Sequence, residues 1–219
     1  MRSRLAVIGT FYGRHERTAD LMRRVLIESR RRPDEFWVMC EGTDDARAVL
    51  EWAGEADELV LGPMRLHILP TPKDGDRYLV IPYSNKINYA LDRTECDYIV
   101  YLDNGSMPHR DKYASMASAL DKHPEWGAVY CGQRRTGVVT YDAHAHEPEP
   151  DAYCKLNYTQ VMHRRTAARW DLDMKWADPD LADARFWRAL HPDLGPFIPV
   201  APGRLLDDHH IEAYKAVGL

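Results

Sequence analysis

The clearest apolar run along the chain covers residues 98–102, where five apolar residues follow one another without a polar break. Such a run is typical of a strand that is buried on both faces of a sheet. It ends at Asp103, and Asn104-Gly105 has turn chemistry. Because ligands of open α/β sheets bind at the carboxyl ends of the strands, Asp103 is a candidate site residue. A purely turn-capping role for Asp103 fits the spacing equally well.

Apolar patterns predict strands and helices that alternate along the rest of the chain. Strands are predicted at residues 5–11, 36–40, 58–62, 66–69, 127–131 and 153–162. Apolar residues at helical spacing predict helices at residues 16–30, 46–53, 84–93, 113–120 and 180–190. This alternation favours a parallel α/β sheet, and 219 residues fit one domain that covers residues 1–219.

Composition and charge narrow the class of protein. The net charge of −5 is unusual for a general nucleic-acid binder. Residues 1–32 nevertheless hold nine arginines against three acidic residues, which indicates either a solvated helix face or a surface for a polyanion. No apolar run approaches the roughly 18 residues of a membrane span. Four separate cysteines without a CxxC pair, and no apolar signal segment, favour a reducing, cytoplasmic location.

Three strand ends converge if the sheet is parallel. They carry Thr10 to Arg14, Glu41 and Asp103, and none has a glycine pattern of the dinucleotide-binding or P-loop kind. Any phosphate bound there must therefore be neutralised differently. A metal held by Asp103 is one option, and Arg14 or Lys86 is another.

The tail offers four consecutive potential metal ligands at residues 207–210. Carboxylates suit Mg²⁺ or Mn²⁺, and imidazole is better tolerated by the transition metal. The alternative is that the two aspartates cap a short helix at residues 211–217. Asp178, Asp180 and Asp183 similarly fit the start of a helix, or one of them is a general base.

The order of these segments resembles the GT-A nucleotide-diphospho-sugar glycosyltransferases, especially the family-2-like group. Residues 84–91 (SNKINYAL) match the polar helix that precedes the metal-binding DxD strand, and residues 97–103 match that strand. The resemblance is strongest over residues 5–131. It implies a three-layer α/β/α sandwich with a mainly parallel sheet, in which residues 1–131 bind the donor. Residues 132–219 would form the acceptor side and a closing tail.

The resemblance also implies roles for individual residues. Thr10 and Tyr12 would contact the base or ribose, Glu41 the uracil-like edge or ribose, and Lys86 the diphosphate or sugar. The implied donor-binding residues are Thr10, Tyr12, Arg14, Glu41, Asn85, Lys86, Asp103 and Asn104.

The implied metal site departs from the family pattern, because Gly105 stands where the second aspartate of DxD is expected. Asp103 would then need Asp208, His209 or His210 to complete the shell around Mn²⁺ or Mg²⁺. The implied base is Asp178, Asp180 or Asp183, within a stretch that looks like the acidic motif before the acceptor-side helix.

The resulting prediction is a metal-assisted glycosyltransferase that uses a UDP- or GDP-sugar and a hydroxyl acceptor. The acceptor is expected to be soluble or macromolecular, and the basic first helix leaves room for DNA with a hydroxylated base. Two alternatives stand beside it: a nucleotide-sugar-binding module without turnover, and a nucleotidyltransferase.

Overall fold

The computed structural model describes residues 2–11, 20–41, 46–47, 49, 51, 64–71, 81–103, 105–136, 140–141, 156–170, 182–200 and 205–210. Its centre is a seven-stranded sheet in the order β10-β6-β9-β4-β1-β2-β3. The parallel strands β1, β2, β3 and β4 are joined on one side by the antiparallel β9, which leads to β6 and β10. The bounds are β1 Leu5–Phe11, β2 Glu35–Glu41, β3 Arg65–Thr71, β4 Tyr98–Asp103, β6 Ala128–Tyr130, β9 Val161–Arg164 and β10 Phe197–Pro199.

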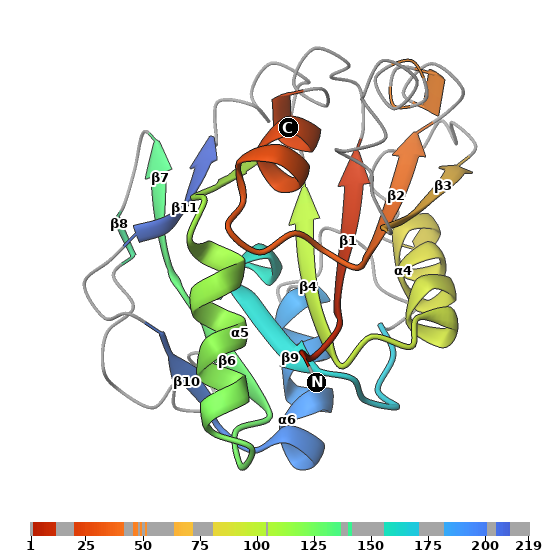
Figure 1. Ribbon diagram of the computed structural model, residues 1–219. Coiled ribbons are helices and arrows are strands. Elements are labelled where there is room, and N and C mark those ends of the chain that lie inside the picture. Colours follow the sequence, from red (N-terminus) through yellow and green to blue (C-terminus); the bar gives the residue numbers. More distant parts are fainter. Residues whose placement is uncertain are drawn as a thin grey trace.

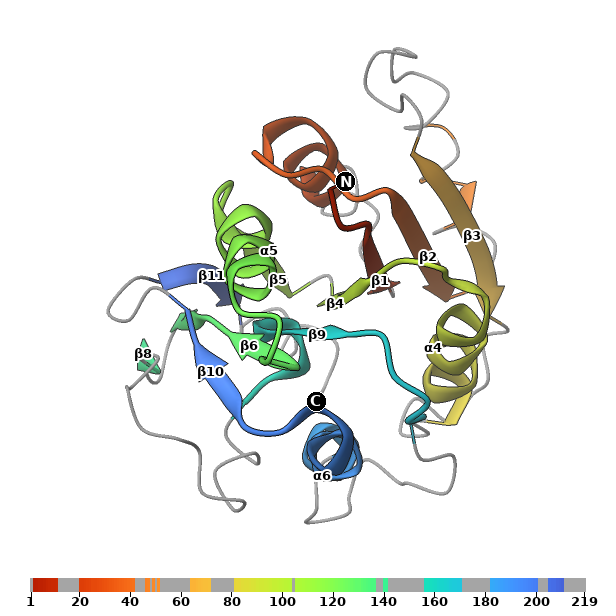
Figure 2. The ribbon, with the colours of Figure 1, turned by 60° about the horizontal axis from the view of Figure 1, so that its bottom comes forward.

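Helices cover both faces of this sheet, which gives the predicted three layers (Figures 1 and 2). Residues 20–28, which end in the π-helical turn η1 (Arg24–Glu28), and helix α5 (Lys112–Lys122) pack on one face. Helices α4 (Ile81–Arg93) and α6 (Ala182–Leu194) pack on the other face. Each face has its own apolar cluster, and β4 is buried along its whole length. The fold class predicted from the sequence is confirmed.

A second sheet of four strands lies beside the carboxyl ends of the main sheet, in the order β5-β11-β7-β8. Its strands are β5 Ser106–Pro108, β7 Gly132–Thr136, β8 Thr140–Tyr141 and β11 Leu205–His210. Pro108 takes part in this pairing because β5 lies at the edge of the small sheet, where a missing N–H is tolerated. One alternative from the sequence is corrected here. Asp207 and Asp208 lie inside a strand and therefore do not cap a helix.

One further element differs from its prediction. The segment 153–162 was expected to be a strand, but Tyr158–Gln160 forms a short 3-10 helix, η3, and the strand begins at Val161. A capping box explains the difference, because the Asn157 side chain accepts a hydrogen bond from Thr159 N and Gln160 bonds back to Asn157 N. The predicted strand at residues 58–62 lies outside the described residues.

Gly127 shows how tightly α6 closes on the sheet. A Cβ atom added to Gly127 would overlap the backbone carbonyl of Leu194, the last residue of α6. We expect Gly127→Ala to lower the free energy of unfolding by about 1–3 kcal/mol, since a backbone atom cannot move aside as a flexible side chain can. Chemical denaturation measures the loss. Ser118→Ala on the exposed side of α5 is the control, and it should stay within about 0.5 kcal/mol of the parent. An equal loss in both variants would contradict the account.

Candidate functional site

The carboxyl ends of β1, β2 and β4 meet at one edge of the main sheet. Thr10 of β1 lies opposite Asp103 of β4 on one side and Met39 of β2 on the other. Thr10 and Asp103 are both buried. The structure thus brings together two of the residues that the sequence singled out, at the edge where a parallel α/β sheet binds ligands.

The turn after β4 is built around the carboxylate of Asp103. Its Oδ1 accepts hydrogen bonds from the backbone N–H of Gly105 at 2.9 Å and of Ser106 at 2.8 Å. The turn-capping role of Asp103 is therefore confirmed. It does not compete with a role in binding, because the same bonds hold the carboxylate in a fixed position at the sheet edge.

Strand β11 carries the tail of the chain to this turn. It pairs antiparallel with β5, so that Asp208 lies opposite Met107 and His209 opposite Ser106. Ser106 is also the residue whose N–H bonds to Asp103. The side chain of Asp208 is half exposed, and its Oδ1 lies 3.7 Å from Nε of Arg134. The backbone pairing of β11 with β5 therefore places the tail next to the turn that follows Asp103, as expected.

Asp207 has a different role from its neighbour Asp208. Its side chain is fully buried, and its Oδ2 lies 3.1 Å from Nζ of the equally buried Lys112. The same oxygen accepts hydrogen bonds from Gln133 Nε2 at 3.0 Å and Thr159 Oγ1 at 3.2 Å. This cluster joins α5, β7, η3 and β11. Sequence analysis missed it, although Lys112 stands at helical spacing with the apolar residues of α5, which is a signal for a buried cation.

Tyr158 is a second residue that the sequence analysis missed. Its hydroxyl lies 3.1 Å from Thr10 Oγ1, so η3 reaches the carboxyl end of β1. Since Tyr158 and Thr159 are adjacent, η3 links the Thr10 end of the edge to the buried Asp207. Nothing in the local sequence indicated this contact, because it joins residues far apart in the chain.

Helix α4 carries the polar motif of residues 84–91. The helix leads from the carboxyl end of β3 back to the start of β4, so its first turns lie nearest the site edge. Asn85 is exposed and Lys86 is half-buried. Asn88 has a structural role, because its side chain donates to Trp170 O at 2.9 Å and accepts from Trp170 N at 2.8 Å.

The backbone positions of four further predicted site residues are described. Glu41 ends β2, Asp183 is the second residue of α6, and His209 and His210 lie in β11, but their side chains are not described. The predicted residues outside the described ranges are Tyr12, Arg14, Asn104, Asp178 and Asp180.

The metal site remains a prediction. Within the described ranges, no group of three His, Cys, Asp or Glu residues lies close enough to hold a metal ion. The side chains of His209 and His210, which the prediction needs, are among those not described.

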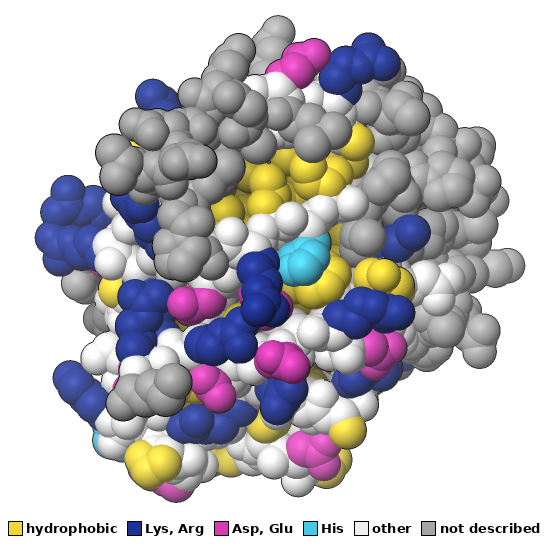
Figure 3. Space-filling view, turned by 45° about the vertical axis from the view of Figure 1, so that its right-hand side comes forward, with side chains coloured by type: hydrophobic (Ala, Val, Ile, Leu, Met, Phe, Trp, Pro, Cys, Tyr) yellow, Lys and Arg dark blue, Asp and Glu magenta, His cyan; other side chains and the backbone are white. Residues whose placement is uncertain are grey.

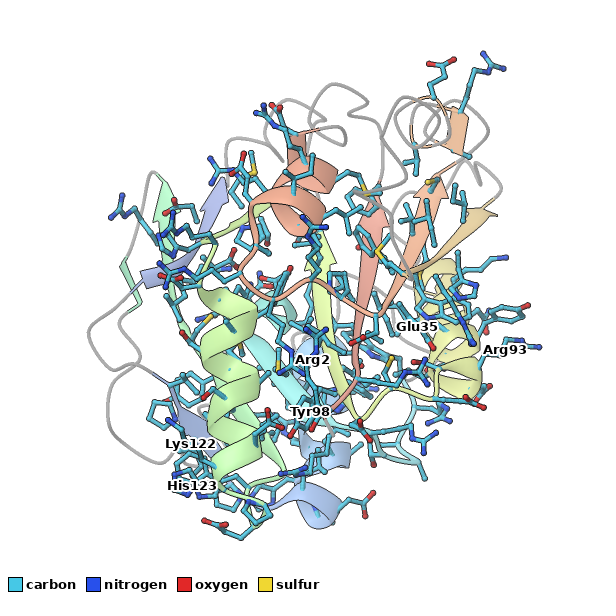
Figure 4. The ribbon with its side chains drawn as sticks, viewed as in Figure 1. Arg2, Glu35, Arg93, Tyr98, Lys122 and His123 are labelled. Carbon is cyan, nitrogen blue, oxygen red and sulfur yellow. The ribbon has the colours of Figure 1, made fainter. Side chains whose placement is uncertain are left out.

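Ion pairs occupy most of the described arginines near the amino terminus. Arg2 pairs with Asp34, Arg4 with Glu35, Arg23 with Asp20 and Glu28, Arg30 with Asp111, and Arg31 with Asp121. Figure 4 places Arg2, Glu35 and Tyr98 at the amino-terminal ends of the strands, opposite the candidate site. On the side of α4 and β3, basic and acidic side chains are interspersed next to an apolar patch (Figure 3). These contacts favour the interpretation that the arginines form a solvated face held by ion pairs, and not a surface that binds a polyanion.

His163 and Arg164 have structural roles within the fold, whereas the neighbouring Arg165 is exposed. His163 is fully buried, with Nε2 3.1 Å from Tyr101 OH and Nδ1 2.7 Å from Arg164 O. Burial lowers the pKa of His163 to about 4, so the ring is neutral. Nδ1 therefore donates to the carbonyl, and Nε2 accepts from Tyr101. Arg164 donates to the Leu120 and Trp126 carbonyls.

Solved structures of glycosyltransferases share this fold, as the sequence resemblance predicted. S. aureus TarS superimposes with a TM-score of 0.71 at 13% identity, over 95% of this chain and 37% of TarS. Residues 1–349 of TarS in complex with UDP-GlcNAc give 0.69 at 13% identity, over 94% of this chain and 58% of that one. The mannosyltransferase PcManGT from Pyrobaculum calidifontis, in complex with GDP-Man and Mn²⁺, gives 0.65 at 18% identity, over 95% and 57%.

Sequence comparison finds similarity to curated proteins but to no family model. Protein CgeD of Bacillus subtilis (strain 168) is 30% identical over 143 residues, which are 58% of this chain and 33% of CgeD. No family model matches the chain. The chain therefore spans about a third of this relative, and the structural likeness establishes a GT-A-like glycosyltransferase fold. Among the described helices, none is both long and apolar enough to cross a lipid bilayer.

Proposed function

We propose that this protein transfers a sugar from a nucleoside-diphosphate sugar to a hydroxyl acceptor. The observation that carries the proposal is the site edge, where Thr10 and Asp103 lie on neighbouring strands and β11 brings His209 opposite Ser106. The glycosyltransferase fold supports it, and two structures with that fold hold UDP-GlcNAc and GDP-Man. A UDP- or GDP-sugar is therefore the proposed donor.

The proposed donor site follows the carboxyl ends of β1, β2 and β4. Thr10 and Tyr12 would contact the base or ribose, and Glu41 the base edge or ribose. Lys86 from α4 would approach the diphosphate, and Tyr158 would hold the Thr10 hydroxyl through its 3.1 Å contact. Arg14, Asn85 and Asn104 complete the proposed set. Residues 1–131 would form this donor part, and residues 132–219 the acceptor side with the closing tail.

The residues of this edge fit a divalent cation, although they offer it fewer carboxylates than the DxD pattern does. Gly105 offers no side chain, and the Asp207 carboxylate is already neutralised by Lys112. That leaves Asp103, Asp208 and a tail histidine, an oxygen and imidazole set that suits Mn²⁺ better than Mg²⁺. When bound, such a cation supplies Lewis-acid stabilisation of the leaving diphosphate. Asp103 is one proposed ligand, and it is completed either by Asp208 and His210 on one face of β11 or by His209 on the other face, because side chains alternate along a strand.

The proposed base is Asp178, Asp180 or Asp183, which would take the proton of the acceptor hydroxyl. The test replaces each by Asn and measures nucleoside diphosphate released from UDP- and GDP-sugars, with and without acceptor. We expect one variant to lose at least about 100-fold in turnover while it keeps its donor affinity. Asp193→Asn, near the end of α6, is the matched control and should keep its turnover.

Other outcomes separate the alternative functions. Donor binding without release of nucleoside diphosphate from any donor would indicate a binding module, which the replacement of the second DxD aspartate by Gly105 favours. Release of pyrophosphate from a nucleoside triphosphate and a sugar phosphate would indicate a nucleotidyltransferase. Unchanged turnover in all three variants would contradict the assignment of the base.

The proposal extends to the acceptor and to the location of the protein. The proposed acceptor is a soluble or macromolecular hydroxyl compound, and a hydroxylated DNA base is one member of that class. Cys40, Cys96 and Cys131 are buried free thiols. Burial raises the pKa of both Cys96 and Cys131 to about 12. Unreactive free thiols are compatible with the proposed cytoplasmic location.

A further inference from the structure

Strand β11 has a sequence in which every residue is doubled. It reads Leu205-Leu206-Asp207-Asp208-His209-His210. A shift by one residue would therefore leave a residue of the same type at three of its positions. Side chains alternate between the two faces of a strand, and register is normally fixed by that alternation. In β11 the pattern is too repetitive to select one of the two histidines for the place opposite Ser106.

Two buried positions distinguish the observed register of β11 from the registers shifted by one residue. Leu206 is fully buried in the apolar cluster beneath α5, and Asp207 is buried against Lys112. A shift in one direction would put Asp207 into the apolar position of Leu206. A shift in the other direction would put Leu206 against the Lys112 ammonium and leave that cation buried without a counter-ion, which is costly.

A β-bulge next to these positions makes a shift geometrically possible. Leu205 lies opposite Gly132 and Asp207 opposite Gln133, so Leu206 is an extra residue between two successive partners on β7. Bulges accommodate one additional residue without ending the pairing. The register of the following three residues therefore depends on which residue occupies the bulge and which meets Lys112.

We propose that Lys112 and Asp207 act as positioning residues that set the register of β11 and thereby place His209, and not His210, opposite Ser106. Gln133 and Thr159 reinforce this choice, because both donate to the same Asp207 oxygen that faces Lys112. The register claim stands on the geometry alone. Its consequence, that His209 is the tail histidine that acts at the site, rests on the proposed function.

The substitution Asp207→Leu tests the proposal because it extends the doubled leucines to three. The introduced leucine can take the buried bulge position, Asp208 can then meet Lys112, and His210 moves opposite Ser106. We expect the whole strand to shift by one residue. In the control, Lys112→Met is combined with Asp207→Leu; no buried cation attracts Asp208 there, and the original register should remain.

Disulfide trapping reads the register directly, since opposite residues of antiparallel strands lie within disulfide reach. Ser106→Cys is combined with His209→Cys or with His210→Cys, and cross-links are mapped by mass spectrometry to exclude the native cysteines. The parent and the control should cross-link 106 to 209. The Asp207→Leu protein should cross-link 106 to 210, alone or beside the first product. If that protein does not fold, Asp207→Val, which also offers an apolar side chain for the buried bulge position, replaces it with the same expectation.

Cross-linking of 106 to 210 in the parent, or only of 106 to 209 in a folded protein that carries the Asp207 substitution and keeps Lys112, would overturn the proposal. A second readout concerns the site. His209→Ala should weaken Mn²⁺-dependent UDP binding at least tenfold in the parent, whereas His210→Ala should do so in the Asp207→Leu protein. Absence of nucleotide binding in every variant would count against the proposed function, and the cross-links would still decide the register.

Discussion

Lys112→Met is expected to lower the free energy of unfolding by about 3–5 kcal/mol. The Nζ of Lys112 lies 3.1 Å from Asp207 Oδ2, and both side chains are fully buried. Removal of the cation leaves a carboxylate inside the protein with only the neutral donors of Gln133 and Thr159. A buried charge without a counter-ion is among the most destabilising single changes. Urea denaturation followed by circular dichroism measures the difference.

Two comparisons isolate the charge effect. The double variant Lys112→Met with Asp207→Leu removes both charges, and it should recover most of the loss. Arg23→Met breaks an exposed ion pair with Asp20 at 3.5 Å, and such pairs contribute less than about 1 kcal/mol. A Lys112→Met loss no larger than that of Arg23→Met, or a double variant less stable than the single, would contradict the account.

Acid should destabilise the protein through His163. Burial lowers the pKa of this histidine from 6.5 to about 4. Between pH 6.5 and 4 the unfolded chain therefore binds a proton at this residue that the folded protein excludes. The contribution of neutral His163 to stability is fully present above pH 6.5. As the pH decreases, the free energy of unfolding falls by about 3 kcal/mol in total at pH 4.

The matched variant is His163→Gln, which keeps a neutral hydrogen-bonding side chain near the Tyr101 hydroxyl and does not titrate. Unfolding free energies of both proteins are measured from pH 7 to pH 4, and the difference between the two slopes belongs to His163. We expect the parent to lose more stability than the variant across this window. Parallel curves would show that His163 is accessible to protons in the folded state.

The main sheet was predictable because its signals are local. Five apolar residues define β4, and residues at helical spacing define α5, so each element could be placed without knowledge of its partners. The order of strands and helices was enough to indicate a parallel α/β sheet. The residues Thr10 and Asp103 followed from the same signals, since they stand where two of these strands end.

The small sheet and the Lys112–Asp207 pair were not predictable in the same way. The strand β11 is largely polar, and its partners β5 and β7 lie far away in the sequence. Lysine is rarely buried, so its place in the apolar stripe of α5 did not outweigh the expectation of exposure. At η3, the capping box of Asn157 and Gln160 outweighed the weak alternation that had indicated a strand.

Nucleotide-dependent thermal stability is the most direct test of the donor site at the ends of β1 and β4. The protein is melted with UDP, GDP, UDP-sugars and GDP-sugars, each with Mn²⁺, with Mg²⁺ and with chelator. A ligand at 100 times its dissociation constant stabilises by about 2.7 kcal/mol, which is a readable shift. We predict a Mn²⁺-dependent shift with one base that disappears in Asp103→Ala and persists in Asp193→Asn. No shift with any nucleotide under any of these conditions would contradict the assignment of this edge as a nucleotide-sugar site.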